Sequence, residues 1–179
     1  AVMAGRGADQ RGVRVRRLDP DTGAVLWSRE IQIDETPGAV VSASVTAGAA
    51  ARLVVSVSYS LPDAAPTPRR QAILSINSDN GDLLWQTAQF ATLSGGAQAT
   101  VTGDGGVNVR HGDCVNPPGC TQIGELLSRL SESTGQPVWT VPSSGTTLGS
   151  RGIDLIVQRF DTGNSLAALS GASGSDLWS

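Results

Sequence analysis

The stretch Leu18-Asp19-Pro20-Asp21-Thr22-Gly23-Ala24-Val25-Leu26-Trp27 is one of four similar phrases in this chain. The other three run from Ile76 to Trp85, from Leu130 to Trp139 and from Leu169 to Trp178. In each phrase an apolar residue lies nine positions before the tryptophan and a glycine lies four positions before it, and the chain has no other tryptophan. Repetition on this scale indicates an array of similar structural units.

Each phrase has the composition of a strand, a tight turn and a second strand. Apolar residues flank a cluster of Asp, Asn, Ser, Thr and Gly, which are the residues that form tight turns. A positive φ at the repeated glycine would explain why no side chain occurs there. One hairpin cannot bury both of its faces, so we expect the tryptophans to pack between neighbouring units.

The spacing of the tryptophans suits a β-propeller. Successive tryptophans are 58, 54 and 39 residues apart, and a four-stranded propeller blade needs about 40–45 residues. The two longer intervals contain proline-rich or glycine-rich stretches, Leu61 to Pro68 and His111 to Cys120, which we interpret as loop insertions.

The repeated phrase resembles the tryptophan-docking repeat of pyrroloquinoline-quinone-type β-propellers, Ala-x-Asp-x-x-Thr-Gly-x-x-x-Trp. Its tryptophan falls on Trp27, Trp85, Trp139 and Trp178, and its glycine on Gly23, Gly81, Gly135 and Gly174. The alanine survives only as Ala168, because Arg17, Ser75 and Arg129 replace it elsewhere, and the aspartate survives only as Asp19. The resemblance implies an all-β propeller of four-stranded antiparallel blades. Such repeats occur in quinone-dependent dehydrogenases and in non-catalytic scaffolds alike.

Composition and chain ends define the expected domain. High glycine content, 22 residues, and few charged residues, 16%, favour short strands with tight turns. We expect one propeller segment over residues 1–179, with blade ends near the four tryptophans. It would hold roughly three complete blades and part of another, as a fragment of a longer chain or a unit completed by other chains. The net charge of −3 favours neither nucleic acid nor membrane attraction, and we expect no membrane insertion.

Cys114 and Cys120 are the two cysteines of the chain, on either side of a Pro-Pro-Gly turn. A local disulfide, which would place the protein outside the cytosol, is the favoured interpretation. A metal site using His111 and Asp113 with the two cysteines is an alternative, although the spacing is unusual for zinc, and free thiols are another. We interpret His111, the single histidine, as an exposed loop residue, because it lies in a glycine-rich polar stretch. A serine–histidine–aspartate triad would have to use it, but no Gly-x-Ser-x-Gly elbow is present.

Two further groups of residues have competing interpretations. The acidic turns at Asp19 to Gly23 and Ser78 to Asp82 faintly resemble calcium loops, but turn formation alone explains them. Arg14 and Arg16 alternate with Val13 and Val15, so they share one strand face, with Arg11 and Arg17 nearby. That face is either solvated or a docking patch for an anion or an acidic partner.

These observations favour a non-catalytic scaffold or protein-binding module outside the cytoplasm of a bacterium, with no cofactor, no bound metal and no catalytic residues. Family members of this kind include an outer-membrane assembly lipoprotein. The first alternative is a segment of a quinone-dependent alcohol or sugar dehydrogenase. The adjacent cysteine pair that such enzymes hold over the cofactor is absent here, and each tryptophan already belongs to a docking phrase. The second alternative is a structural subunit completed by other chains.

The cysteine pair gives the first testable prediction. A disulfide between Cys114 and Cys120 would stabilise the fold by about 2 kcal/mol, because it closes a short loop in the unfolded chain. Intact mass spectrometry of exported protein should therefore show a gain of two hydrogens on reduction. Two free thiols in protein purified without reductant would contradict both the disulfide and the extracytoplasmic location.

Overall fold

The structure is a computed structural model that describes residues 1–8, 11–33, 40–48, 51–59, 70–87, 90–91, 99–114, 123–143, 145–160 and 163–179. All its regular elements are strands. They are β1 (Val2–Arg6), β2 (Gly12–Leu18), β3 (Val25–Gln32), β4 (Val40–Ala47), β5 (Arg52–Tyr59), β6 (Arg70–Asn77), β7 (Leu83–Gln86), β8 (Phe90–Ala91), β9 (Ala99–Val101), β10 (Val107–Cys114), β11 (Ile123–Leu130), β12 (Pro137–Pro142), β13 (Gly145–Arg151), β14 (Asp154–Arg159), β15 (Ser165–Leu169) and β16 (Asp176–Trp178). Among these elements there is no apolar helix long enough to cross a bilayer.

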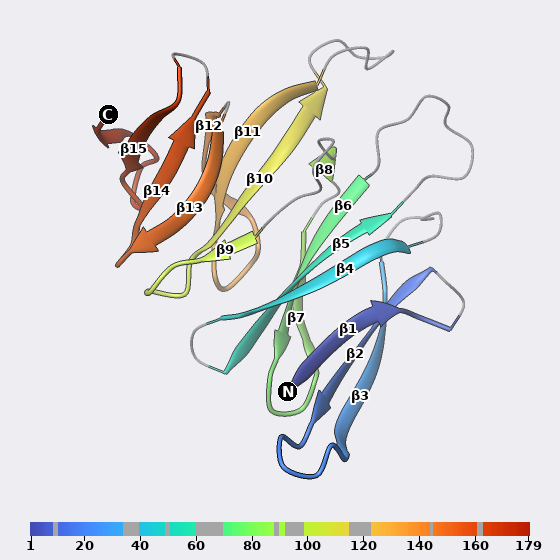
Figure 1. The fold of residues 1–179 in the computed structure, drawn as a ribbon. Coiled ribbons are helices and arrows are strands. Elements are labelled where there is room, and N and C mark those ends of the chain that lie inside the picture. The colour runs from blue at the N-terminus through green and yellow to red at the C-terminus, as the bar shows by residue number, and fades with distance from the viewer. Residues whose placement is uncertain are drawn as a thin grey trace.

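The strands form four antiparallel groups that follow one another along the chain (Figure 1). The first sheet has the order β1-β2-β3 and the fourth has the order β13-β14-β15-β16. The second sheet is β4-β5-β6-β7 and the third is β9-β10-β11-β12, and the short strand β8 pairs with both β6 and β10 and so joins these two. Figure 1 shows the first and fourth sheets at opposite ends of the array. The expected all-β class, with three four-stranded blades and part of another, is confirmed.

Each repeated phrase forms the hairpin between the last two strands of its sheet. In the first turn the Asp19 amide donates to the Ala24 carbonyl and the Gly23 amide donates to the Asp19 carbonyl, and the same pair of bonds recurs in the other three turns. All four repeated glycines have positive φ, between 70° and 80°. A register shift lies next to each turn at the same place, between Arg17 and Leu18 in the first sheet. The turn chemistry therefore sets the same hairpin geometry four times.

Alternation along the strands makes three apolar layers between the sheets. Val13 and Val15 of the first sheet pack with Val55 and Leu74 of the second. A second cluster joins Ile73 and Trp85 to residues of the third sheet, and a third joins Leu127 to residues of the fourth. Because both faces of the middle sheets are covered, their strands are almost continuously buried, as in β5 and β6.

A tryptophan closes each of these layers by docking on the turn of the next sheet. The Trp27 indole N–H donates to the Ser78 carbonyl at 2.9 Å. A Cβ added to Gly81 would lie 2.8 Å from Cε3 of Trp27, so the ring lies directly on that glycine. Trp85 stacks in the same way on Gly135, and Trp139 on Gly174. No described sheet lies beyond the fourth, and Trp178 is accordingly half exposed.

The difference between inner and terminal tryptophans predicts a matched pair of stability effects. Trp85 is 8% exposed and Trp178 is 51% exposed. Trp85→Ala should therefore lower the free energy of unfolding by about 3–5 kcal/mol, because it removes a buried ring and a hydrogen bond. Trp178→Ala should cost less than about 1 kcal/mol, since its ring gains little from burial. Urea unfolding of both variants checks this, and similar losses would contradict the docking interpretation.

Candidate functional site

The polar centre of each junction between sheets is a single backbone carbonyl that lies seven residues before the next tryptophan. At the first junction the Ser78 carbonyl accepts both the Trp27 indole N–H, at 2.9 Å, and Nη1 of Arg17, at 2.8 Å. At the second junction the Glu132 carbonyl accepts from Trp85, at 2.6 Å, and from the Arg52 guanidinium. A carbonyl oxygen has two lone pairs, so one turn can bind both donors.

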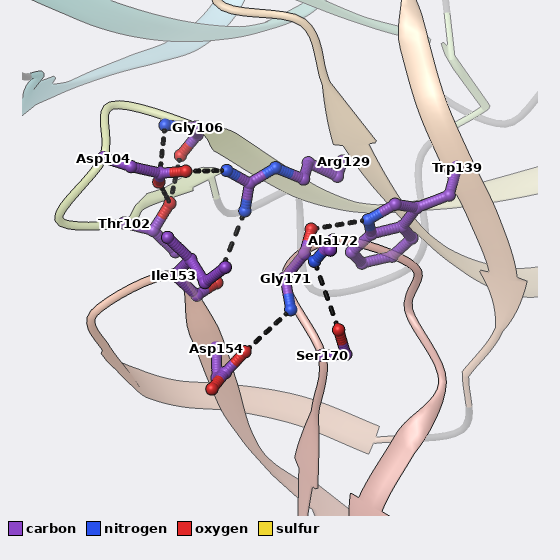
Figure 2. A network of polar contacts seen from close by, with 10 residues as sticks. All are labelled: Thr102, Asp104, Gly106, Arg129, Trp139, Ile153, Asp154, Ser170, Gly171 and Ala172. Atoms are coloured by element: carbon purple, nitrogen blue, oxygen red, sulfur yellow. Dashed lines mark hydrogen bonds and ion pairs between the residues drawn. The ribbon is translucent and has the colours of Figure 1, made fainter.

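Arg129 has the corresponding role at the third junction, with more partners (Figure 2). Its side chain leaves β11 and is buried. Nη2 donates to Oδ2 of Asp104 in the loop between β9 and β10, while Nη1 lies 3.4 Å from the Ile153 carbonyl of the fourth sheet. Trp139 donates beside it to the Gly171 carbonyl, at 2.9 Å. One guanidinium thus links a loop of the third sheet to the turn between β13 and β14.

Two glycines make room for this guanidinium. A Cβ on Gly106 would lie 2.2 Å from Nη2 of Arg129, and a Cβ on Gly171 would lie 1.9 Å from the Ile153 carbonyl oxygen. The Gly171 amide also donates to Asp154, at 3.0 Å. A side chain at Gly106 would displace the Arg129 guanidinium, and a side chain at Gly171 would clash with the backbone of Ile153. The contacts of this junction therefore favour glycine at both positions.

The carboxylate of Asp104 is held in its charged form. Partial burial raises the pKa of Asp104, but hydrogen bonds from Thr102 and the Gly106 amide, together with the charge of Arg129, outweigh it. The pKa of Asp104 therefore lies below its usual value. Asp104 accepts from the Thr102 hydroxyl at 2.6 Å and from the Gly106 amide at 3.3 Å, which leaves little capacity to bind anything else. Through Arg129, this cluster links the third sheet to the fourth.

The interpretation of His111 as an exposed loop residue is wrong. His111 lies within β10, pairs with Leu126 of β11 and is buried. Its Nε2 lies 2.8 Å from Oγ of Ser128, which in turn lies 2.7 Å from Oγ1 of Thr140. The strand continues through His111 because β11 offers a complete pairing partner there, which overrides the local glycine content. Ser128 is itself buried, so both side chains lie in the packed interior.

The structure tests the remaining candidate residues only in part. Cys114 ends β10, but Cys120 lies outside the described residues, so their disulfide stays a prediction. The insertion from Leu61 to Pro68 also lies outside them. Within the described part of the chain, no three His, Cys, Asp or Glu side chains gather closely enough to hold a metal ion. In the first acidic turn, Oδ1 of Asp19 is already used by the amides of Asp21 and Thr22.

An exposed apolar position on the outermost strand of each sheet went unnoticed in the sequence. The residue just before each docking tryptophan is apolar and faces solvent in all four sheets: Leu26, Leu84, Val138 and Leu177. Val25 and Leu83 extend the exposure by one residue in the first two sheets. We call these six residues the apolar rim. The signal was present as an apolar residue before every tryptophan, but periodicity alone does not tell an outer strand from a core strand.

The Asp104 cluster yields a prediction on acid stability. Because the folded-state pKa of Asp104 is lowered, its contribution is complete above the unfolded pKa of about 4 and is lost as the pH falls through the folded value. Asp104→Asn should cost about 1 kcal/mol at pH 7, since the pair is partly screened by solvent, and much less at pH 2. Asp79→Asn, at the more exposed Arg17 pair, is the control and should cost less. Urea unfolding at both pH values measures the difference, and a pH-independent effect would contradict the assignment.

Comparisons with known proteins agree with this architecture. A family model described as outer membrane protein assembly factor BamB matches residues 11–179. The crystal structure of BamB from Moraxella catarrhalis superposes with a TM-score of 0.58 at 13% identity, covering 98% of this chain and 46% of that one. A quinohemoprotein alcohol dehydrogenase, ADHIIG from Pseudomonas putida HK5, superposes with a TM-score of 0.53 at 14% identity, covering 93% and 32%. The search of curated proteins gave no match.

The structural likenesses, at such low identity, show the fold alone, and this chain spans about half the length of the BamB chain. The family model is stronger evidence of relationship than these superpositions, because it matches nearly the whole sequence. It also agrees with the docking phrases and with the four sheets that they build. The chain therefore belongs to the family described as outer membrane protein assembly factor BamB, whose repeats are of the pyrroloquinoline-quinone type.

Proposed function

We propose that this chain is a non-catalytic β-propeller scaffold that binds protein partners outside the cytoplasm of a bacterium. The observation that carries the proposal is the apolar rim, which places an exposed aliphatic side chain at the same position of all four sheets. Single exposed apolar residues are ordinary, but a repeated set on the outer strands offers a binding surface of regular geometry. The family description, an assembly factor for outer membrane proteins, supports a partner in that process.

The outer strands also suit partner binding because they are sheet edges. β3, β12 and β16 each end their sheet, and β7 pairs with β6 alone. An edge strand presents unpaired N–H and C=O groups to an incoming chain, and side chains beside it add affinity. In the second and third sheets these side chains are Leu84 and Val138.

A segment of a quinone-dependent dehydrogenase is the second candidate, favoured by the likeness to the alcohol dehydrogenase fold. Quinone chemistry needs planar groups that clamp the cofactor and a base that takes the alcohol proton. Here Trp27, Trp85 and Trp139 stack on glycines of the neighbouring sheets, and the buried His111 bonds to a buried serine. These contacts support the scaffold over the enzyme. A structural subunit completed by other chains is the third candidate.

Site-specific cross-linking tests the scaffold proposal. A photo-reactive residue at Leu84 or Val138, in tagged protein within its own cells, should capture the same discrete partner at both positions. Leu148 is the matched control, because it is apolar and 55% exposed, against 58% for Val138, but lies on β13, at the opposite edge of its sheet from the docking tryptophan. Adducts that are equally frequent at Leu148, or absent from the rim, would contradict the proposal.

A titration with pyrroloquinoline quinone and calcium distinguishes the enzyme candidate. We expect neither saturable binding by absorbance nor dye reduction with alcohols or sugars. Saturable binding with dye reduction would replace the scaffold proposal with the dehydrogenase.

A further inference from the structure

The outer face of the first sheet differs chemically from the faces that are buried between sheets. Eleven residues before the docking tryptophan, the second, third and fourth sheets carry Leu74, Ser128 and Ala167, all buried and uncharged. The first sheet carries Arg16 at this position, and Arg16 is exposed. Covering an unpaired guanidinium with an apolar sheet would cost its hydration. Any group that covers Arg16 would therefore have to provide acceptors for its guanidinium.

This face contains a shallow hollow. It is lined by Met3, Ala4, Gly5, Arg6, Arg14 and Arg16. The pairing of β1 with β2 sets Met3 opposite Arg16 and Gly5 opposite Arg14, so these residues share one face. A Cβ on Gly5 would meet no atom within 4 Å, which keeps the middle of the hollow open. Met3 is exposed beside the arginines, so the lining combines cationic and apolar groups.

The hollow is lined by arginines in a chain of negative net charge. Three of the thirteen basic residues line it, whereas the chain as a whole carries a formal charge of −3. Nη2 of Arg14 pairs with Oε2 of Glu30 at 2.8 Å, and the Ala8 amide donates to the same carboxylate. Among the described ion pairs none involves Arg16. The planar guanidinium of Arg16 is thus exposed and able to bind a carboxylate through two parallel hydrogen bonds.

We propose that this hollow is the docking site for an acidic peptide segment of a partner protein. The proposal rests on the scaffold function and names the chemistry of one partner. Arg16 binds an aspartate or glutamate of the peptide, and Met3 contacts an apolar side chain next to it, because a thioether adapts to irregular surfaces. A nucleic acid is disfavoured, since the negative chain would repel a polyanion beyond this small patch.

Fluorescence anisotropy with a labelled peptide tests the site. The probe alternates aspartate with alanine and leucine, and its counterpart has asparagine in place of every aspartate. The aspartate peptide should bind the full chain, more weakly as salt is raised, and the asparagine peptide should bind on the order of tenfold more weakly. Arg16→Gln should weaken binding of the aspartate peptide about tenfold, and Arg16→Lys by less, because lysine keeps the charge.

Arg151→Gln is the matched control, because Arg151 is an exposed arginine on β13 of the fourth sheet. It should change the affinity less than about twofold, since Figure 1 shows β13 at the opposite end of the array from β1 and β2. Equal binding of the two peptides, or equal losses in Arg16→Gln and Arg151→Gln, would overturn the proposal. So would single-stranded DNA or inorganic phosphate that displaces the peptide with the same dependence on Arg16. Thermal unfolding confirms that the variants are folded.

The peptide assay can fail independently of the cross-linking test of the scaffold proposal. Cross-linking at Leu84 and Val138 reports on the apolar rim of the second and third sheets, whereas the peptide assay reports on the first sheet. If the aspartate peptide does not bind but cross-links still form at the apolar rim, the acidic-partner proposal is overturned and the scaffold proposal stands.

Discussion

The stacking of an indole on a glycine of the next sheet is the interaction on which this structure depends. A single sheet cannot bury both of its faces, and the tryptophan fixes how far apart neighbouring sheets lie. The Trp85 ring leaves no space for a Cβ on Gly135, and its N–H binds the Glu132 carbonyl of the same turn. Dispersion and a hydrogen bond thus act together on one turn, and the positive φ of the glycine makes that approach feasible.

Arginine reinforces this contact at positions where the family repeat has a small residue. Arg17 and Arg129 both replace the alanine of the repeat, and both extend to the neighbouring sheet. Each donates to a backbone carbonyl of the neighbouring sheet and also to a carboxylate, which is Asp79 for Arg17 and Asp104 for Arg129. Arg52 reaches the second junction from a different strand, which shows that the carbonyl, and not the arginine position, is the fixed element.

The surfaces left after this packing are of two kinds. The apolar rim recurs with the repeat and belongs to every sheet, whereas the arginine-lined hollow belongs to the first sheet. A repeated surface suits a partner that contacts several sheets at once, and a single charged hollow suits one that binds at a defined end. A scaffold gains selectivity when one partner has to bind both surfaces at once, because two linked contacts bind more tightly than either contact alone.

The sequence by itself determined the repeat, its hairpins and the all-β class, because turn chemistry and strand alternation act over a few residues. Gly23 and Trp27 carry that information locally, and so do their counterparts in the other phrases. The roles of Arg17 and Arg129 and the burial of His111 were decided by the tertiary structure. Each depends on residues of another strand or sheet, such as Ser78, Ile153 and Ser128. Alternation assigns a side chain to a face, but only the packing of the sheets decides whether that face is covered by a neighbour or left to solvent.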